Sequence, residues 1–245
     1  MVYLYKLSAL YASLLKLIGY ERGISRFIDR LELDCPRDLR MLDVGCGSGI
    51  VGLRFLERFP GATLLATDLE PNFLKATLAN ARSRGLDEKR IEVGLSDINA
   101  PDQVTLLDGD RRVLDKQSFD IVSVGGVLGY SQNQQGTIET LLSLIKPGGY
   151  LVDLEMSESP AGSFVSKTYH CTAMPLESMR TFIEAAGHRV CVVPFSLANF
   201  PANLTRIGII AKVSGPDQAT NFAPAAVLTQ TGPPYGSKSD FDYST

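Results

Sequence analysis

The sequence of 245 residues contains no tryptophan, only two histidines and only four cysteines. The cysteines are far apart and no two have the CxxC spacing, so a zinc site built from Cys and His is poorly supported. Dispersed thiols are typical of a reducing compartment, and we therefore expect a cytoplasmic protein.

Long hydrophobic runs are also missing. In the most apolar stretch, at the N-terminus, Lys6 and Lys16 leave only nine uncharged residues between them. A membrane-spanning helix needs about 20 apolar residues, so we expect no membrane span. Lys16 stands where a signal peptide would have its apolar region, which predicts that the chain is not processed.

Neither charge sign is in large excess. The 24 basic residues and 27 acidic residues give a net charge of -3, which argues against a general surface for nucleic acid. Hydrophobic residues make up 44% of the chain, enough for a packed core, so a wholly disordered chain is excluded.

Short apolar runs alternate with segments of helical periodicity. We expect helices at about 3–18, 24–31, 49–58, 71–84, 136–145 and 175–186. We expect strands at about 40–44, 62–67, 90–96, 119–124, 149–155, 189–194 and 205–213.

This alternation predicts an α/β fold with a doubly wound, mostly parallel sheet of seven strands. The last two predicted strands have no helix between them, so one of them should be antiparallel to the rest. We expect an N-terminal helical cap at 1–34, a ligand-binding domain at 35–213 and a tail rich in Pro, Gly, Ser and Thr at 214–245.

The most informative segment is a glycine-rich turn, Leu42-Asp43-Val44-Gly45-Cys46-Gly47-Ser48-Gly49, between a strand and a helix. Glycines permit a sharp turn and let a ligand approach the backbone closely. The turn could also exist without a ligand. Residues 47–52 match the GxGxxG pattern of dinucleotide-binding proteins, but Asp43 would repel a pyrophosphate and suits a ligand with a cationic amino group.

Residues 42–49 resemble the first motif of class I S-adenosylmethionine (SAM) dependent methyltransferases. Further segments resemble later motifs of this family in the expected order: 67–71, 95–98, 119–122 and 145–151. The resemblance covers about residues 40–155 and implies a Rossmann-like methyltransferase architecture, with SAM as methyl donor and S-adenosylhomocysteine (SAH) as product.

The resemblance also implies which residues bind the cofactor: Asp43, Gly45, Cys46, Gly47, Gly49, Asp68, Leu69, Asp97, Ile98 and Gly125. Within this set, Asp68 would hold the ribose hydroxyls, Asp97 would accept from the adenine amine, and Leu69 and Ile98 would enclose the ring.

Each of these residues also has a plain structural explanation. Asp43 could brace the glycine turn, Asp68 could begin a helix and Asp97 could cap a loop. Leu69 and Ile98 could be ordinary core residues. Cys46 is expected to pack as a small buried thiol rather than act as a nucleophile.

The methyl acceptor is not evident from the sequence. The segment 125–130 after the fourth predicted strand has no carboxylate, so we expect no metal site there. His170 and Tyr130 are the candidate catalytic residues, although a surface role is the simpler explanation for His170. His188 is expected to serve a helix end.

We therefore expect a metal-independent enzyme that methylates a small, apolar metabolite, with no nucleic-acid partner. In one alternative the protein keeps the SAM pocket but acts as a cyclase, a pericyclase or a non-catalytic partner of another protein. An NAD-dependent oxidoreductase, supported only by residues 47–52, is the other alternative.

Overall fold

The computed structural model describes residues 19–172 and 174–215. The helix expected at 3–18 and most of the expected tail lie outside these ranges. The strands are β1 (Arg40–Val44), β2 (Thr63–Asp68), β3 (Ile91–Leu95), β4 (Gln103–Leu106), β5 (Arg111–Val113), β6 (Phe119–Val124), β7 (Ile145–Met156), β8 (Arg189–Pro194) and β9 (Arg206–Lys212).

The described α-helices are α2 (Tyr20–Arg30), α3 (Ile50–Arg58), α4 (Pro71–Ser83), α5 (Gln134–Leu144), α6 (Pro160–Thr168) and α7 (Leu176–Ala185). Short 3-10 turns occur at η1 (Glu88–Arg90), η2 (Leu128–Tyr130), η3 (Leu197–Asn199) and η4 (Ala202–Leu204).

All described strands form one twisted sheet in the order β5-β4-β3-β2-β1-β6-β7-β9-β8. The five central strands, β3, β2, β1, β6 and β7, are parallel to one another. Strand β9, beside β7, is antiparallel to it. The expected α/β class and the antiparallel strand at the C-terminal end are therefore confirmed. The described sheet has nine strands rather than the expected seven, because β4 and β5 form an extra antiparallel hairpin beside β3.

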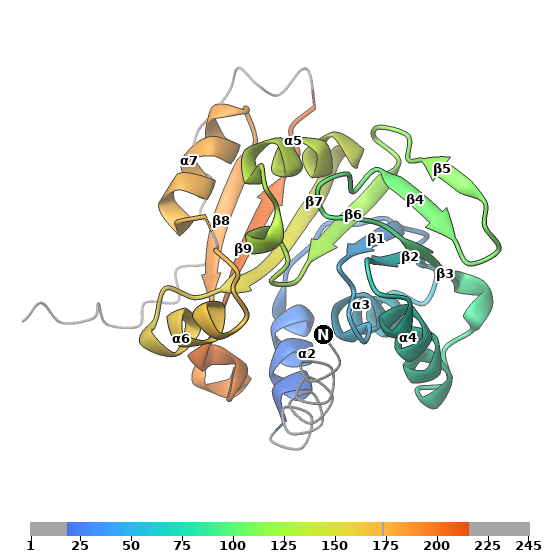
Figure 1. The fold of residues 1–245 in the computed structure, drawn as a ribbon, viewed down its shortest axis with the longest axis horizontal. Helices are drawn as coiled ribbons and strands as arrows, with labels where there is room; N and C mark the ends of the chain where they lie inside the picture. Colours follow the sequence, from blue (N-terminus) through green and yellow to red (C-terminus); the bar gives the residue numbers. More distant parts are fainter. Residues whose placement is uncertain (1–18, 173, 216–245) are drawn as a thin grey trace, which may run out of the picture.

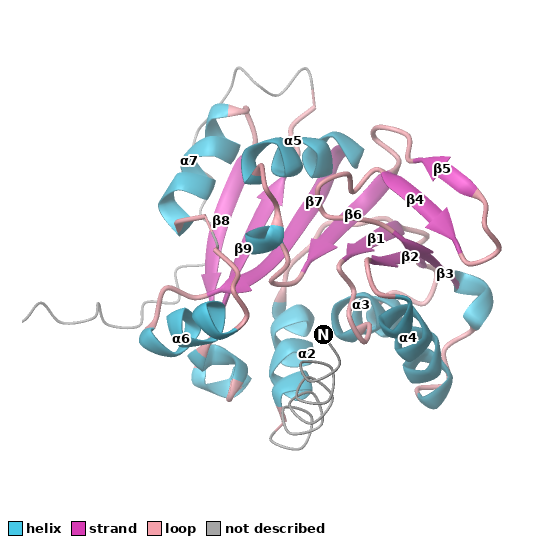
Figure 2. Cartoon of the chain, in the orientation of Figure 1, coloured by secondary structure: helices cyan, strands magenta, loops and turns pink. Residues whose placement is uncertain are grey.

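Helices cover both faces of this sheet (Figures 1 and 2). On one face, α2, α3 and α4 pack over a core that includes Phe27, Phe55 and Leu74. On the other face, α5 and α7 pack over a second core that includes Leu141 and Ile183. This arrangement makes the central strands apolar on both sides, as parallel sheets between two helix layers are.

Helix α2 is the part of the expected N-terminal cap that the structure describes. The rings of Phe27 and Phe195 stack with their centroids 4.0 Å apart and nearly parallel. Gly208 of β9 leaves room for Phe27, because a Cβ there would lie 2.3 Å from the tip of that ring. These contacts fix α2 against the sheet beside the carboxyl ends of its strands.

The chain leaves β1 toward β2 on one side, while β6 lies on the other side of β1. Ligands of open α/β sheets bind in the crevice outside the carboxyl ends of the strands at such a switch point. We therefore expect a ligand site at the loops that follow β1, β2 and β6.

Candidate functional site

The glycine-rich turn follows β1 at this switch point. Gly45, Gly47 and Gly49 have positive φ angles of 65°, 54° and 80°, a region that residues with a side chain rarely adopt. The Gly49 N–H donates to the Cys46 carbonyl at 2.8 Å, and the Cys46 N–H donates to Thr67 of β2 at 2.9 Å. The turn is therefore held in one shape by its own backbone and by the neighbouring strand.

Helix α4 holds the same turn from outside. The Thr77 hydroxyl donates to the Gly47 carbonyl at 3.0 Å, and the Asn80 side-chain amide donates to the Ser48 carbonyl at 2.9 Å. Sequence reasoning missed both residues. Their spacing of three places them on the same face of a helix, which was the only available signal.

Asp43, near the end of β1, is buried directly beneath the turn. Its Oδ1 accepts from the Ser123 hydroxyl at 2.7 Å, and its Oδ2 accepts from the Gly52 N–H at 3.0 Å. Burial raises the pKa of this carboxyl to about 6, and the two hydrogen bonds limit the shift. At neutral pH the carboxylate is ionised and can attract a cationic group.

Asp68 ends β2 and lies next to the turn. Its Oδ2 accepts from the Gly47 N–H at 2.9 Å, and its Oδ1 accepts from the Glu70 N–H at 3.0 Å. Burial raises its pKa, while these hydrogen bonds favour the ionised form. A carboxylate has about four acceptor positions, so both oxygens can still accept from two hydroxyl groups.

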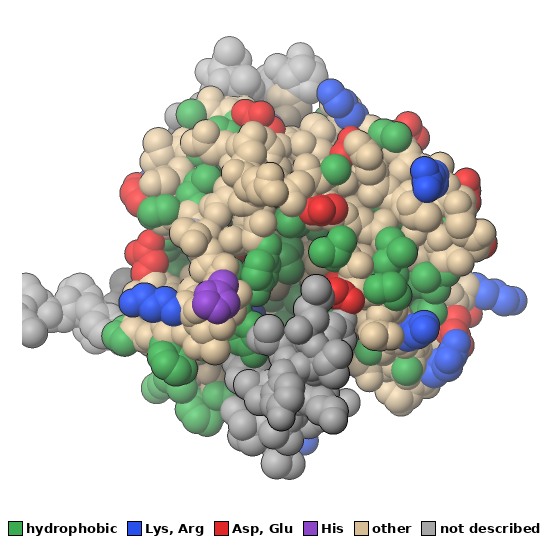
Figure 3. Space-filling model, viewed as in Figure 1, with side chains coloured by type: hydrophobic (Ala, Val, Ile, Leu, Met, Phe, Trp, Pro, Cys, Tyr) green, Lys and Arg blue, Asp and Glu red, His purple; other side chains and the backbone are tan. Residues whose placement is uncertain are grey.

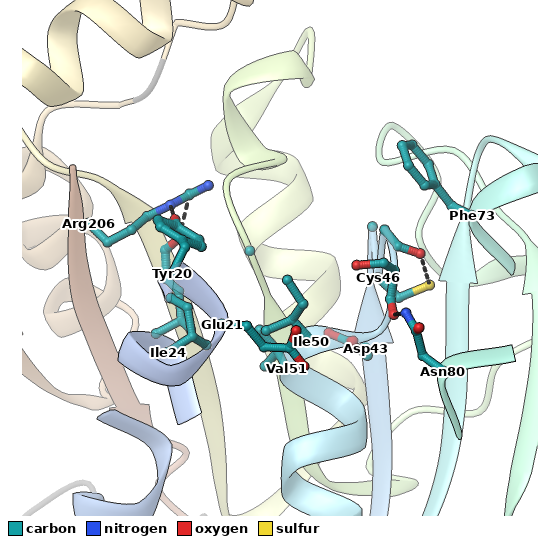
Figure 4. Close-up of a pocket in the computed structure, with 15 residues that line it drawn as sticks. Tyr20, Glu21, Ile24, Asp43, Cys46, Ile50, Val51, Phe73, Asn80 and Arg206 are labelled. Carbon is teal, nitrogen blue, oxygen red and sulfur yellow. Dashed lines mark hydrogen bonds between the residues drawn. The ribbon is translucent and has the colours of Figure 1, made fainter. Parts of the chain in front are cut away.

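A cavity of about 440 Å³ opens between this turn and helix α2. Five of the residues expected to bind a cofactor line it: Asp43, Gly45, Cys46, Gly47 and Gly125. Figure 4 shows the turn and Asn80 on one side, and Tyr20, Ile24 and Arg206 on the other. Figure 3 shows a hollow with hydrophobic side chains in the middle of this face.

Two glycines enlarge this cavity. A Cβ on Gly47 would have no atom within 4 Å, and one on Gly125 would meet only Val51, at 3.9 Å. Both therefore leave space for a ligand at the backbone. Gly49 is different, because it is the N-cap residue of α3 and a Cβ there would lie only 2.8 Å from the Thr77 side chain.

Two of the other expected cofactor residues, Leu69 and Asp97, line a second hollow, and Leu69 is 62% exposed. Asp68 and Gly49 line neither hollow, although Asp68 bonds to the glycine-rich turn. Asp97 accepts from the Asn99 backbone N–H at 2.9 Å, which is the loop-capping role considered above. Ile98 does not line either hollow and packs, half-buried, against the core on the side of α5.

The candidate catalytic residues lie elsewhere. His170 is exposed, with a φ of 53°, and does not line the cavity at the glycine-rich turn. Tyr130 is 49% exposed and lines a smaller neighbouring cavity. Burial raises the pKa of Tyr130, so its hydroxyl keeps its proton at neutral pH. His188 accepts from the Ser214 N–H at Nδ1, and burial lowers its pKa.

Sequence reasoning also missed a pair of residues on the far wall of the cavity. Arg206, at the start of β9, donates from Nε to the Tyr20 hydroxyl of α2. It also donates from Nη1 to the Leu154 carbonyl at 3.0 Å. The pair joins residues 186 positions apart, so no local pattern predicts it.

Two buried carboxyls of β7 lie near this arginine. Asp153 is fully buried, and neither of its oxygens has a hydrogen-bond partner within the described part of the chain. Burial, followed by the charge of Glu155, raises the pKa of Asp153 well above its usual value. Burial also raises the pKa of Glu155. The described residues contain no group of three or more His, Cys, Asp or Glu that could hold a metal, and no described helix could cross a membrane.

Known proteins share both the sequence pattern and the fold. Residues 42–151 match the family model described as a methyltransferase domain. The demethylmenaquinone methyltransferase of Thermus thermophilus is 28% identical over 66% of this chain and 68% of its own length. The malonyl-acyl-carrier-protein O-methyltransferase of Acetivibrio thermocellus is 28% identical over 51% of this chain, but this match covers only 38% of that protein.

Solved structures agree with this fold. An O-methyltransferase family protein from Burkholderia thailandensis has a TM-score of 0.63 at 19% identity, over 82% of this chain and 58% of that one. The cyclase SpnF has a TM-score of 0.56 at 18% identity, over 79% of this chain and 80% of that one. The chain therefore contains a methyltransferase domain at residues 42–151, and together with the ordered motifs and the glycine-lined cavity these findings support a class I SAM-dependent methyltransferase.

Proposed function

We propose that this protein transfers the methyl group of SAM to a small organic acceptor. The observation that supports this most strongly is the position of two carboxylates at one turn. Asp43 lies buried under the turn, and Asp68 is anchored to the N–H of Gly47 within it. SAM carries an ammonium group and two ribose hydroxyls, which are the groups that two such carboxylates can bind.

The residues present fit this ligand. The ionised Asp43 would attract the ammonium group, and Asp68 would accept from the ribose hydroxyls. The open backbone at Gly47 and Gly125 would let the ligand lie against the strand ends. Leu69 and Asp97, in the neighbouring hollow, would be placed for the adenine ring.

When bound, SAM supplies a methyl group already activated by its positive sulfur. The protein then has to orient an acceptor and exclude water, which can contribute about 7–11 kcal/mol to lowering a barrier. The two candidate bases offer little: Tyr130 keeps its proton at neutral pH, and His170 is turned to solvent. We infer an acceptor that needs no strong base.

We also propose that the reaction is independent of a metal ion. The backbone that follows β6 carries Gly125 and Gly126 where a metal-binding carboxylate could otherwise stand. All four cysteines are free thiols in the structure. This fits the reducing cytoplasm, which we propose as the location.

Titration calorimetry with SAH tests the cofactor site. We expect the wild-type protein to bind SAH, and Asp68→Asn to bind at least about tenfold more weakly, because hydrogen bonds to a charged group are lost. Asp87→Asn is the matched control. Its Oδ1 also accepts from the N–H of the residue two positions later, Lys89. Asp87, however, precedes β3 and so lies at the amino ends of the parallel strands, away from the glycine-rich turn. No SAH binding by the wild type would refute the proposal.

A second candidate function keeps the same cavity without methyl transfer. It is favoured by the structural similarity to the cyclase SpnF and by the position of His170, the candidate base, outside the cavity at the glycine-rich turn. In that case SAM would bind and remain intact while an added substrate rearranged. A nucleotide-binding oxidoreductase would instead bind NADH tightly, which a fluorescence titration would show.

A further inference from the structure

The smaller cavity that Tyr130 lines has a volume of about 170 Å³ and adjoins the main cavity at the glycine-rich turn. Tyr20 and Arg206 line both cavities, so this hydrogen-bonded pair forms their common wall. A group in the smaller cavity would lie directly beside the ligand in the larger one. If the main cavity holds SAM, the smaller cavity is the place for an acceptor.

The volume of the smaller cavity limits what it can hold. It equals the liquid volume of about six water molecules, and is below the roughly 300–1,000 Å³ of sites for drug-sized ligands. Its walls include Tyr130, Tyr169, Met156 and Val165. A single ring or a short chain would fill it, with its polar end toward the common wall.

Arg206 gives this small cavity its charge. Of the eight described residues that line the cavity, Arg206 alone is charged. Its Nε and Nη1 each donate one hydrogen bond, to Tyr20 and to Leu154. Within the described ranges Nη2 has no hydrogen-bond partner. Because a guanidinium has five N–H groups in a fixed fork, three remain for a ligand.

The backbone of the strand β6 end is shaped around this guanidinium. Gly126 has a φ of 69°, and a Cβ there would lie only 2.2 Å from Nη1 of Arg206. Any side chain at this position would displace the arginine from the common wall. Glycine at 126 therefore keeps the charge at the boundary of the two cavities.

The buried carboxyls near Arg206 do not line the small cavity. Asp153 and Glu155 lie on β7 and are nearly or fully buried. Burial raises the pKa of both carboxyls, and the charge of Glu155 raises the pKa of Asp153 further. Burial alone would lower the pKa of Arg206, but Tyr20 and the two carboxyls raise it, so the guanidinium stays charged.

We propose that the methyl acceptor carries a carboxylate, which Arg206 binds from the small cavity beside the main one. This inference rests on the proposed function, since it assigns the substrate class of the same site. The planar guanidinium suits a carboxylate, and the fixed, half-buried position strengthens the attraction. Tyr20 acts as a positioning residue, because it accepts from Nε and holds the fork toward the cavity.

The test uses the full chain saturated with SAH and two pairs of probes, benzoate with benzamide and malonate with malonamide. Within a pair, the shape is nearly the same and only the charge differs. We expect at least one carboxylate to bind at least about tenfold more tightly than its amide. Equal affinity within both pairs would overturn the inference.

Variants then locate the binding. Arg206→Met should remove the preference for the carboxylate, whereas Arg180→Met should keep it, because Arg180 pairs with Glu184 on the exposed surface of α7. Val165→Phe should block the small cavity and leave Arg206 in place, which covers the case in which Arg206→Met fails to fold. A preference that survives both Arg206→Met and Val165→Phe would place the carboxylate elsewhere and overturn the inference.

The first titration separates the two levels of the argument. Failure of the wild type to bind SAH would contradict the proposed function itself. SAH binding without any preference for carboxylates would leave the proposed function standing and reject only the assigned substrate class.

Discussion

Burial of Asp43 changes the pH range in which its carboxyl is charged and can attract a cationic ligand. Its carboxyl is 2% exposed and has hydrogen bonds to Ser123 and Gly52, yet burial still raises its pKa to about 6. An acid with a raised pKa loses its charge as the pH falls through that value. The attraction for a ligand ammonium group is therefore present above about pH 6 and lost below it.

This behaviour predicts the pH dependence of SAH binding. We expect the dissociation constant of the wild type to rise as the pH falls from about 7.5 to about 5. Asp43→Asn should bind about tenfold more weakly at neutral pH, because the charged partner is lost, and should show a flatter pH profile. Calorimetric titrations across this range measure both effects. A wild-type affinity that does not change with pH would contradict the role of Asp43.

Asp153 gives a prediction for stability rather than binding. Because burial raises its pKa in the folded state, the unfolded chain releases this proton at a lower pH than the folded chain does. The stabilisation is complete below the ordinary carboxyl pKa and is lost as the pH rises through the folded value. Asp153→Asn should therefore flatten the fall in the free energy of unfolding as the pH rises above the ordinary carboxyl pKa of about 4. Urea titrations at several pH values test this, and an unchanged slope would count against it.

At the residue scale, sequence patterns found the groups that belong to local motifs. Asp43 and Asp68 stand at fixed positions after strands, so a motif could indicate them. Tyr20 and Arg206 could not be found in this way, because the fold brings together residues from α2 and β9. The unpartnered oxygens of Asp153 likewise depend on what surrounds β7 in three dimensions.

At the scale of elements, helix α2 forms one wall of the cavity. Phe27 stacks on Phe195, while Tyr20 and Ile24 of the same helix line the cavity. We expect Phe27→Ala to lower the free energy of unfolding by about 3–5 kcal/mol, as loss of a buried aromatic ring does. Denaturant unfolding measures this.

The control for this change is Val113→Ala, because Val113 is 72% exposed. It should change the free energy of unfolding by less than about 0.5 kcal/mol. A loss for Phe27→Ala no larger than that of the control would show that α2 is not held by this stack.

Elements with a strong apolar period could be predicted, and those without one could not. The strand β1 and the helix α3 lie within a residue or so of where the sequence places them. The strand β5 was missed because its three residues, Arg111 to Val113, are all exposed and include two arginines. Helix α6 was also missed, although Ser159 as its N-cap and Pro160 in its first turn are start signals.

At the scale of the whole molecule, ligand binding should stabilise the fold, because residues of α2, α3, α4, β1, β7 and β9 together line the cavity. A ligand at about 100 times its dissociation constant adds about 2.7 kcal/mol to the free energy of unfolding. We expect SAH to raise the thermal midpoint, and NADH at the same concentration to leave it unchanged. A larger rise with NADH would favour the oxidoreductase alternative.

The most direct test of the central claim is to follow SAM itself. The protein is incubated with SAM carrying an isotopically labelled methyl group and with an extract of small metabolites, and the products are analysed by mass spectrometry. We predict that SAH accumulates together with a labelled metabolite, and that Asp68→Asn makes much less of both. SAM that binds but remains intact, with no labelled product in the extract, would contradict the assignment of methyl transfer.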